Sequence, residues 1–240
     1  MKIIIVDTPE EFGKAAFNEV YKVVKNNPYA TLGLATGSTP LPLYVEMVKD
    51  HRYRGTSYKD VRTFNLDEYV GLPASHKESY VNFMTRNLFS KIDVDMKNVN
   101  IPCGTAENVD EECARYSALL KNAVVDIQVL GIGGNGHIAF NEPGTPFDSV
   151  THRVWLTEKT ISDNSRFFDS IDEVPKSAIT MGIGEIMRAK KILMLASGKN
   201  KADAVFKMIS GKVDESCPAS VLQLHPSVTV ILDKDAASKL

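Results

Sequence analysis

The chain is predicted to fold as an α/β protein of the Rossmann-like three-layer type, with a mainly parallel, twisted sheet flanked by helices on both faces. Short apolar runs rich in β-branched residues alternate along the chain with longer segments whose apolar residues recur at helical spacing. This alternation is typical of βαβ units, in which helices connect parallel strands. The chain has 240 residues, of which 43% are hydrophobic, and we expect a single domain over residues 1–240.

In the first half of the chain, strands and helices are expected to follow one another in strict order. Residues 3–6 are a run of isoleucine and valine, and residues 9–26 carry apolar side chains on one helical face. The elements expected here are strands at 3–6, 30–35 and 61–65 and helices at 9–26, 41–50, 79–88 and 109–122.

The second half begins with a buried strand and becomes less regular after residue 144. A polar segment at 164–168 is compatible with a turn or a helix. The other expected elements are strands at 125–130, 153–156, 191–196 and 228–232 and helices at 183–189 and 201–209.

Composition excludes several classes of function. A formal net charge of -2 and a pI near 6.2 give no basic surface for nucleic acid or membrane, and no apolar run approaches a spanning helix of about 20 residues. The N-terminus is expected to be a strand rather than a signal peptide. Cys103, Cys113 and Cys217 are odd in number and have no CxxC spacing. We therefore expect reduced thiols in a cytoplasmic protein, with no disulfide or zinc site.

A glycine-rich stretch from Val129 to Gly144 follows the strand at 125–130 and delivers three polar side chains, Asn135, His137 and Glu142. Its glycines allow turns and a close approach of the backbone to a ligand. They also match the dinucleotide pattern GxGxxG, but the sequence Asn-Glu-Pro-Gly at 141–144 breaks the helix that a dinucleotide loop must open. A glycine-rich connection with a histidine of structural role only is the remaining alternative.

A pair of acids, Asp67 and Glu68, follows the strand at 61–65. Crowding and burial raise the pKa of a carboxyl group toward neutrality, which suits proton transfer. Two solvated acids on a loop are the alternative interpretation.

Three segments carry groups that suit a phosphate. Thr36, Gly37, Ser38 and Thr39 lie before the helix at 41–50, where free N–H groups favour an anion, although the local sequence fits a helix cap better. Arg166 lies in the polar segment and could clamp a phosphate, although a solvated arginine is commoner. Lys201 starts a helix, where a cation is unfavourable unless an anion is bound nearby.

Four segments together resemble the glucosamine-6-phosphate deaminase family in order and spacing, over nearly the whole chain. They are residues 35–40, 64–70, 131–143 and 164–168. The segment Asn-Gly-His-Ile-Ala-Phe-Asn-Glu-Pro at 135–143 distinguishes this family from the related 6-phosphogluconolactonases, which share the fold. The resemblance implies conversion of glucosamine 6-phosphate to fructose 6-phosphate and ammonia, with no redox cofactor and no catalytic metal.

The resemblance also implies a role for each matching residue. Asp67 is similar to the base that moves a proton between C2 and C1, and His137 is similar to the acid-base group that opens the pyranose ring. Glu142 would orient His137. The substrate phosphate would bind the 36–39 loop, Arg166 and Lys201. Two proton-transfer groups and a distant anchor fit this chemistry, because the open-chain aldehyde must be held while a weakly acidic C–H is deprotonated.

The chain departs from the family in two places. Asn135 stands where many members have Asp, and we expect its neutral amide to orient the His137 imidazole, so that Asn135→Asp would move the acidic limb of the pH-rate profile upward by up to about one unit. His152 and Val154 replace basic residues of the activator site in allosteric hexameric members, and the chain stops soon after the last strand. A monomer or small homo-oligomer without allosteric activation is therefore expected.

Two other functions remain open at this level. One is a lactonase of the related family. The other is a sugar-phosphate sensor of the kind found in transcription regulators, although residues 1–30 hold only a strand and a helix without a basic face for DNA.

Overall fold

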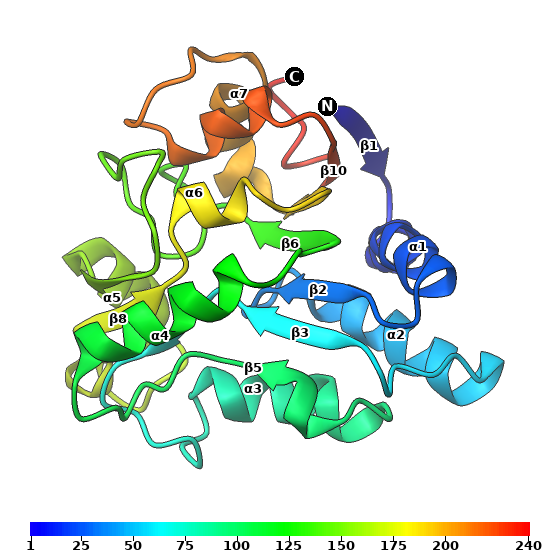
Figure 1. Cartoon of the computed structure of the whole chain (residues 1–240). Coiled ribbons are helices and arrows are strands. Elements are labelled where there is room, and N and C mark those ends of the chain that lie inside the picture. Colours follow the sequence, from blue (N-terminus) through cyan, green and yellow to red (C-terminus); the bar gives the residue numbers. More distant parts are fainter.

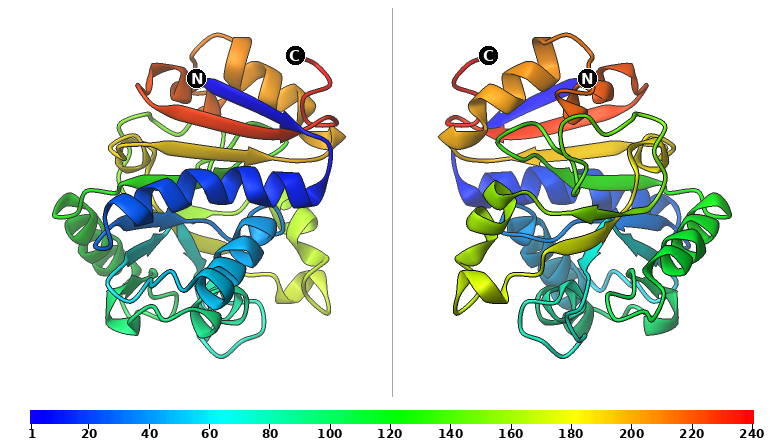
Figure 2. Two further views of the ribbon diagram at one scale, coloured as in Figure 1. Left: turned by 90° about the vertical axis from the view of Figure 1, so that its right-hand side faces the viewer. Right: turned by 90° about the vertical axis from the view of Figure 1, so that its left-hand side faces the viewer.

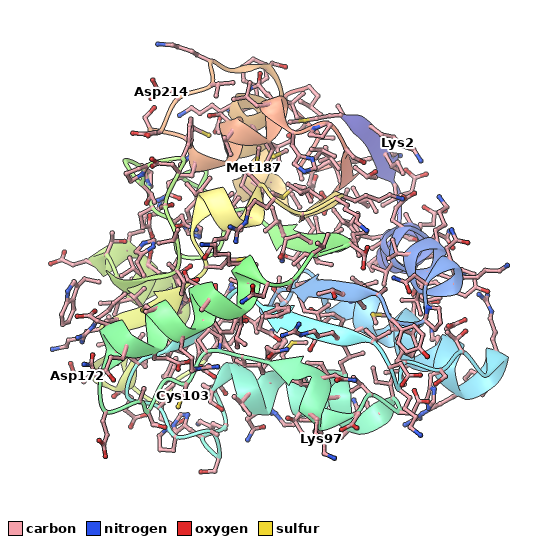
Figure 3. The ribbon with its side chains drawn as sticks, in the orientation of Figure 1. Lys2, Lys97, Cys103, Asp172, Met187 and Asp214 are labelled. Atoms are coloured by element: carbon pink, nitrogen blue, oxygen red, sulfur yellow. The ribbon has the colours of Figure 1, made fainter. Side chains whose placement is uncertain are left out.

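A seven-stranded, entirely parallel sheet forms the centre of the computed structural model, which describes residues 1–240 except the side chain of Asp163 (Figure 1). The strand order is β1-β10-β9-β6-β2-β3-β5. Figure 3 shows Lys2 on one edge strand and Lys97 just before the other. The strands are β1 (Lys2–Val6), β2 (Thr31–Leu34), β3 (Arg62–Asn65), β5 (Val99–Asn100), β6 (Ile127–Gly131), β9 (Ile192–Ala196) and β10 (Val228–Asp233).

Helices cover both faces of this sheet, as the sequence predicts. Helices α1 and α2 lie on one face, and α4, α6 and a second, smaller sheet lie on the other (Figure 2). The helices are α1 (Pro9–Asn26), α2 (Leu41–Arg54), α3 (Tyr80–Asn87), α4 (Val109–Lys121), α5 (Glu158–Ser165), α6 (Ile183–Ile186) and α7 (Ala202–Ser210).

Helix α1 has the bounds expected from the sequence because its signals are strong at both ends. Thr8 caps the first turn by accepting the backbone N–H of Glu11, and the Glu11 carboxylate accepts the Thr8 N–H in return. Pro9 occupies the first helical position, where its missing N–H costs nothing. The apolar face is buried through the length of the helix, at Phe12, Ala16, Phe17, Val20 and Val24.

The second sheet was not expected from the sequence. It is antiparallel, with the order β4-β8-β7, and consists of β4 (Asp67–Tyr69), β8 (Ser177–Thr180) and β7 (His152–Trp155). Only β7 was predicted as a strand. Strand β8 is four residues long and buried throughout, so it shows no alternation of polar and apolar residues. Strand β4 carries two acids, which are uncommon in strands.

Several shorter elements also differ from the sequence prediction. The helix expected at 183–189 ends at Ile186, and the helix expected from Lys201 begins one residue later, after a 3₁₀ turn at Lys199–Lys201. A 3₁₀ helix at Pro218–Leu224 was not predicted, nor was the two-residue β5. All of these differences lie at short elements or element ends, where periodicity carries least information.

Two findings concern membrane spans and cysteines. Within the described residues, no helix combines the length and the apolar character of a membrane span. The three cysteines are free thiols; Cys103 is exposed, while Cys113 and Cys217 are buried. The prediction that no disulfide forms among them is confirmed.

Candidate functional site

A cleft of about 680 Å³ opens at the carboxyl edge of the parallel sheet. Figure 1 shows β2, β3 and β6 pointing to one side of the molecule, and the loops that follow them form part of the cleft wall. Helices α3 and α5 complete the wall with side chains from their ends. This is where open parallel sheets bind ligands. Eight of the ten predicted site residues line the cleft: Thr36, Gly37, Ser38, Thr39, Asp67, His137, Arg166 and Lys201.

Asp67 is a buried acid at the wall of the cleft. Its residue surface is only 7% exposed, and it begins β4 immediately after Leu66, which links the two sheets through backbone hydrogen bonds to Leu34 and Met181. Burial, with a further contribution from the adjacent Glu68 carboxylate, raises the pKa of Asp67 to about 8. A carboxyl group with this pKa can give and take a proton near neutral pH. The alternative of solvated loop acids is wrong.

Glu68 points away from this chemistry, because successive residues of a strand face opposite sides. Its carboxylate accepts the backbone N–H groups of Tyr69, Tyr80 and Val81, two of which are at the start of α3. Glu68 therefore caps a helix, where a negative charge is favourable. The two acids are not a matched pair of proton-transfer groups.

His137 packs its imidazole directly on the backbone of Gly133. A methyl group at Gly133 would lie 2.4 Å from His137 Cε1 and Nε2, so only glycine leaves room for the ring in this position. The Gly133 N–H donates to the His137 carbonyl oxygen at 2.9 Å, and Gly136 completes the turn at a φ of +90°. No helix follows this loop before residue 158, as the sequence argument against a dinucleotide site requires.

Glu142 lies behind His137 rather than in the cleft. One carboxylate oxygen, Oε1, is 3.5 Å from His137 Nδ1, a separation that allows an ion pair but makes no hydrogen bond. Thr160 Oγ1 donates to the same oxygen at 2.6 Å, and Asn135 Nδ2 donates to Oε2 at 2.6 Å. Burial would raise the pKa of Glu142, but these contacts outweigh it and lower the pKa to about 2. Glu142 is therefore an anion at neutral pH.

The 36–39 loop is not a helix cap. The residue that caps α2 is Pro40, and no side chain makes a capping hydrogen bond there. Gly37 turns the chain at a φ of +96°, a conformation that favours glycine, and the loop then lines the cleft. The cap interpretation, which the local sequence favoured, is wrong, and the loop is left facing a space that a ligand could fill.

Arg166 and Lys201 reach the cleft from different elements. Arg166 follows the last residue of α5, and its guanidinium lies over the Phe167 ring at 4.7 Å. Lys201 directly precedes α7, whose N-terminus has an unfavourable field for a cation. The structure thus brings both cations and the 36–39 loop to one cleft, although 165 residues of chain separate Thr36 and Lys201.

The comparisons with known proteins identify the family. The model of the glucosamine-6-phosphate isomerases/6-phosphogluconolactonase family matches residues 7–231. The chain belongs to this family. It is 52% identical to a glucosamine-6-phosphate deaminase of Clostridium novyi (strain NT), with 100% of both chains covered. A glucosamine-6-phosphate deaminase of Thermoanaerobacter pseudethanolicus is 51% identical, with 99% of this chain and 94% of the relative covered.

Solved structures of family members share the fold. A monomeric glucosamine-6-phosphate deaminase superposes with a TM-score of 0.98 at 46% identity, and 100% of both chains is covered. A 6-phosphogluconolactonase from Trypanosoma cruzi has a TM-score of 0.81 at 23% identity, covering 100% of this chain and 96% of the other. At that identity the second likeness shows the common fold alone. The predicted fold class is confirmed.

Within this family fold, Asn135 contacts other atoms than the sequence predicts. Its amide donates to Glu142, and its Oδ1 accepts the backbone N–H of His137 at 3.2 Å. The expectation that the amide holds the imidazole is therefore wrong. Since the amide faces a carboxylate, an aspartate here would repel Glu142 instead of simply adding a charge beside the ring.

The Asn135→Asp variant is expected to be less stable than the parent protein, by about 1–3 kcal/mol above neutral pH, because two carboxylates would replace a hydrogen-bonded pair. The difference should shrink as the pH falls and one proton is shared between the acids. Thermal unfolding between pH 5 and pH 9 measures this. Equal melting temperatures at all pH values would contradict the Asn135 to Glu142 contact.

Other cleft residues were missed by sequence reasoning. They are Tyr80, Arg86, Asn164 and Asn200, together with the acid Glu78. Arg86 lies on the last turn of α3 and donates to the Lys77 carbonyl oxygen at 2.8 Å, and nothing in its local sequence separates it from a solvated arginine. Among the described residues, no group of three or more His, Cys, Asp or Glu side chains is placed to hold a metal ion.

Proposed function

We propose that the protein converts glucosamine 6-phosphate and water to fructose 6-phosphate and ammonia. The observation that carries this proposal is one cleft that holds a buried acid, Asp67, a histidine paired with a carboxylate, and a separate group of cationic and hydroxyl side chains. Full-length relatives about 50% identical to this chain carry the name of this enzyme. The reaction is a hydrolysis of a C–N bond coupled to an isomerisation, and it requires proton transfers at separate positions of one sugar.

His137 is proposed to open the pyranose ring. Its imidazole lines the cleft with one side, while Nδ1 faces the Glu142 carboxylate. The nearby negative charge stabilises the imidazolium that forms when the ring takes a proton. Asn135 and Thr160 hold Glu142 from both of its oxygens and so hold the pair in register.

Asp67 is proposed to move the proton from C2 to C1 of the open-chain sugar. Only its carboxylate form can accept the C2 proton, and its raised pKa makes it a stronger base than an exposed aspartate. Proton transfer from C2 to C1 converts the aldose to a ketose imine, and addition of water releases ammonia. The small exposed fraction of Asp67 limits exchange of this proton with solvent.

The 36–39 loop, Arg166 and Lys201 are proposed to bind the phosphate. They offer backbone and hydroxyl donors with two positive charges, which suit a doubly charged anion. Binding energy from the phosphate holds the reactive open-chain form in place, far from the group that anchors it. We also propose that the protein acts in the cytoplasm as a monomer, since the similar structure at 46% identity is described as monomeric.

Ammonia release from glucosamine 6-phosphate tests the proposed function. The purified protein should release ammonia and fructose 6-phosphate in equal amounts. Hydrolysis of 6-phosphogluconolactone without ammonia release would replace the proposal by the related lactonase activity. Binding of glucosamine 6-phosphate without any turnover would favour a sensor.

Removal of either cation is expected to raise the KM. Arg166→Ala or Lys201→Ala should each raise the KM for glucosamine 6-phosphate by about 10- to 100-fold, the equivalent of one charge-assisted hydrogen bond. Lys199→Ala is the matched control, because Lys199 is exposed, lies in the same 3₁₀ turn and does not line the cleft. Unchanged KM values for both Arg166→Ala and Lys201→Ala would remove them from the phosphate site.

A further inference from the structure

Helix α5 sends one side chain to the carboxylate behind His137. Thr160, which lies 18 residues after Glu142 in sequence, is 7% exposed and donates from Oγ1 to Glu142 Oε1 at 2.6 Å. This is the same oxygen that faces His137 Nδ1 at 3.5 Å. The two groups therefore share one carboxylate oxygen.

The direction of this hydrogen bond is fixed by a second threonine. Thr157 caps α5, and its Oγ1 accepts the backbone N–H of Thr160 at 3.1 Å. The Thr157 hydroxyl hydrogen is then free to point at Thr160 Oγ1, 2.9 Å away. Thr160 in turn directs its own hydrogen to Glu142. A helix cap thus orients a chain of two hydroxyl groups that ends on the carboxylate.

We propose that Thr160 is a positioning residue that sets Glu142 for its interaction with His137. Asn135 holds only the other carboxylate oxygen, so rotation of the carboxylate about its own axis is restrained at Oε1 by Thr160. Since the imidazole makes no hydrogen bond at Nδ1, nothing on the His137 side fixes Oε1. Loss of the Thr160 hydroxyl leaves the carboxylate free to turn away from the ring or into a different geometry.

The arrangement also ties two ends of the cleft to one helix. Arg166, proposed above to bind the phosphate, directly follows the last residue of α5, and Thr160 is the third residue of the same helix. A rigid helix keeps the distance between its residues constant. The position of α5 against the substrate phosphate therefore sets the position of the hydroxyl against Glu142. This coupling rests on the proposed function, whereas the role of Thr160 toward Glu142 rests on the contacts alone.

Thr160→Val tests the proposal, because valine keeps the shape and removes the hydroxyl. The kcat is expected to fall about tenfold or more, as for the loss of one hydrogen bond to a charged group, while the KM stays within about twofold. Thr160→Ser, which restores the hydroxyl, should recover most of the kcat. Thr145→Val is the matched control, because the Thr145 hydroxyl also bonds Glu142, but at its backbone carbonyl oxygen, at 2.7 Å.

A second measurement needs no turnover. The protein has five histidines, and the ¹⁵N NMR signals of the His137 imidazole are assigned by their loss in His137→Gln. These signals should shift in Thr160→Val and return in Thr160→Ser. If the parent protein fails to release ammonia but the shift is seen, the proposed function falls and the role of Thr160 stands. Parent kcat with parent His137 signals in Thr160→Val, or a Thr160→Ser variant as impaired as Thr160→Val, overturns the proposal.

Discussion

Asp67→Asn is expected to abolish proton exchange at the substrate carbons, because an amide cannot accept the C2 proton. Loss of a general base typically lowers the rate by about 10²- to 10⁴-fold. The readout is deuterium incorporated at C1 of fructose 6-phosphate in heavy water. The affinity for the phosphate should change little, since the 36–39 loop and Arg166 are untouched. Normal deuterium incorporation in the variant would move the base elsewhere, and Glu68 is a poor substitute because it caps α3.

The pKa of Asp67 sets the pH dependence of the parent protein. Burial raises this pKa from 3.8 to about 8, so the free enzyme holds the acid mostly protonated at neutral pH. Since the base must be ionised to act, kcat/KM is expected to fall as the pH drops below about 8. A flat profile between pH 6 and pH 9 would show that Asp67 is already ionised and its pKa is not raised.

The same acid should cost stability. The folded protein holds the Asp67 proton up to about pH 8, and the unfolded chain releases it near 3.8, so the folding free energy becomes less favourable as the pH rises through this window. Asp67→Asn removes the cost. Its melting temperature should match that of the parent below pH 4 and exceed it above pH 8, by the equivalent of about 2 kcal/mol.

The central sheet could be predicted from the sequence because its strands and helices have strong patterns. The run of isoleucines in β1 and the capped apolar face of α1 are examples. The small antiparallel sheet could not be predicted, since β4 and β8 are short and lack alternation. The difference matters for the site, because β4 separates Asp67 from Glu68 and so gives one acid to the cleft and the other to a helix.

The candidate site shows the same division. Its members at loop ends, such as His137 and the 36–39 loop, follow from glycine-rich sequence next to a strand. The contacts that tune these groups do not, because they join distant segments. Thr160 meets Glu142 from a helix that the sequence left as a turn, and Asn135 turns its amide to a carboxylate instead of to the ring.

Gly133→Ala is expected to displace the His137 imidazole. The added methyl group would lie within 2.5 Å of three ring atoms, a separation that real atoms do not adopt, so the ring must move. Because the φ of Gly133 is not positive, alanine fits the backbone itself, and the effect is confined to the ring. Displacement by about 1 Å is enough to cost on the order of 10²-fold in kcat.

Gly134→Ala separates this collision from the general effect of a methyl group in the loop. There the nearest atom to the new methyl is the Asn200 carbonyl oxygen at 3.5 Å, an ordinary contact, so kcat should stay within a few fold of the parent. Melting temperatures of both variants should remain near that of the parent, since the ring moves toward the cleft and not into the core. A Gly133→Ala enzyme with parent kcat would mean that the imidazole need not lie on the Gly133 backbone to open the ring, and His137 would lose its proposed role.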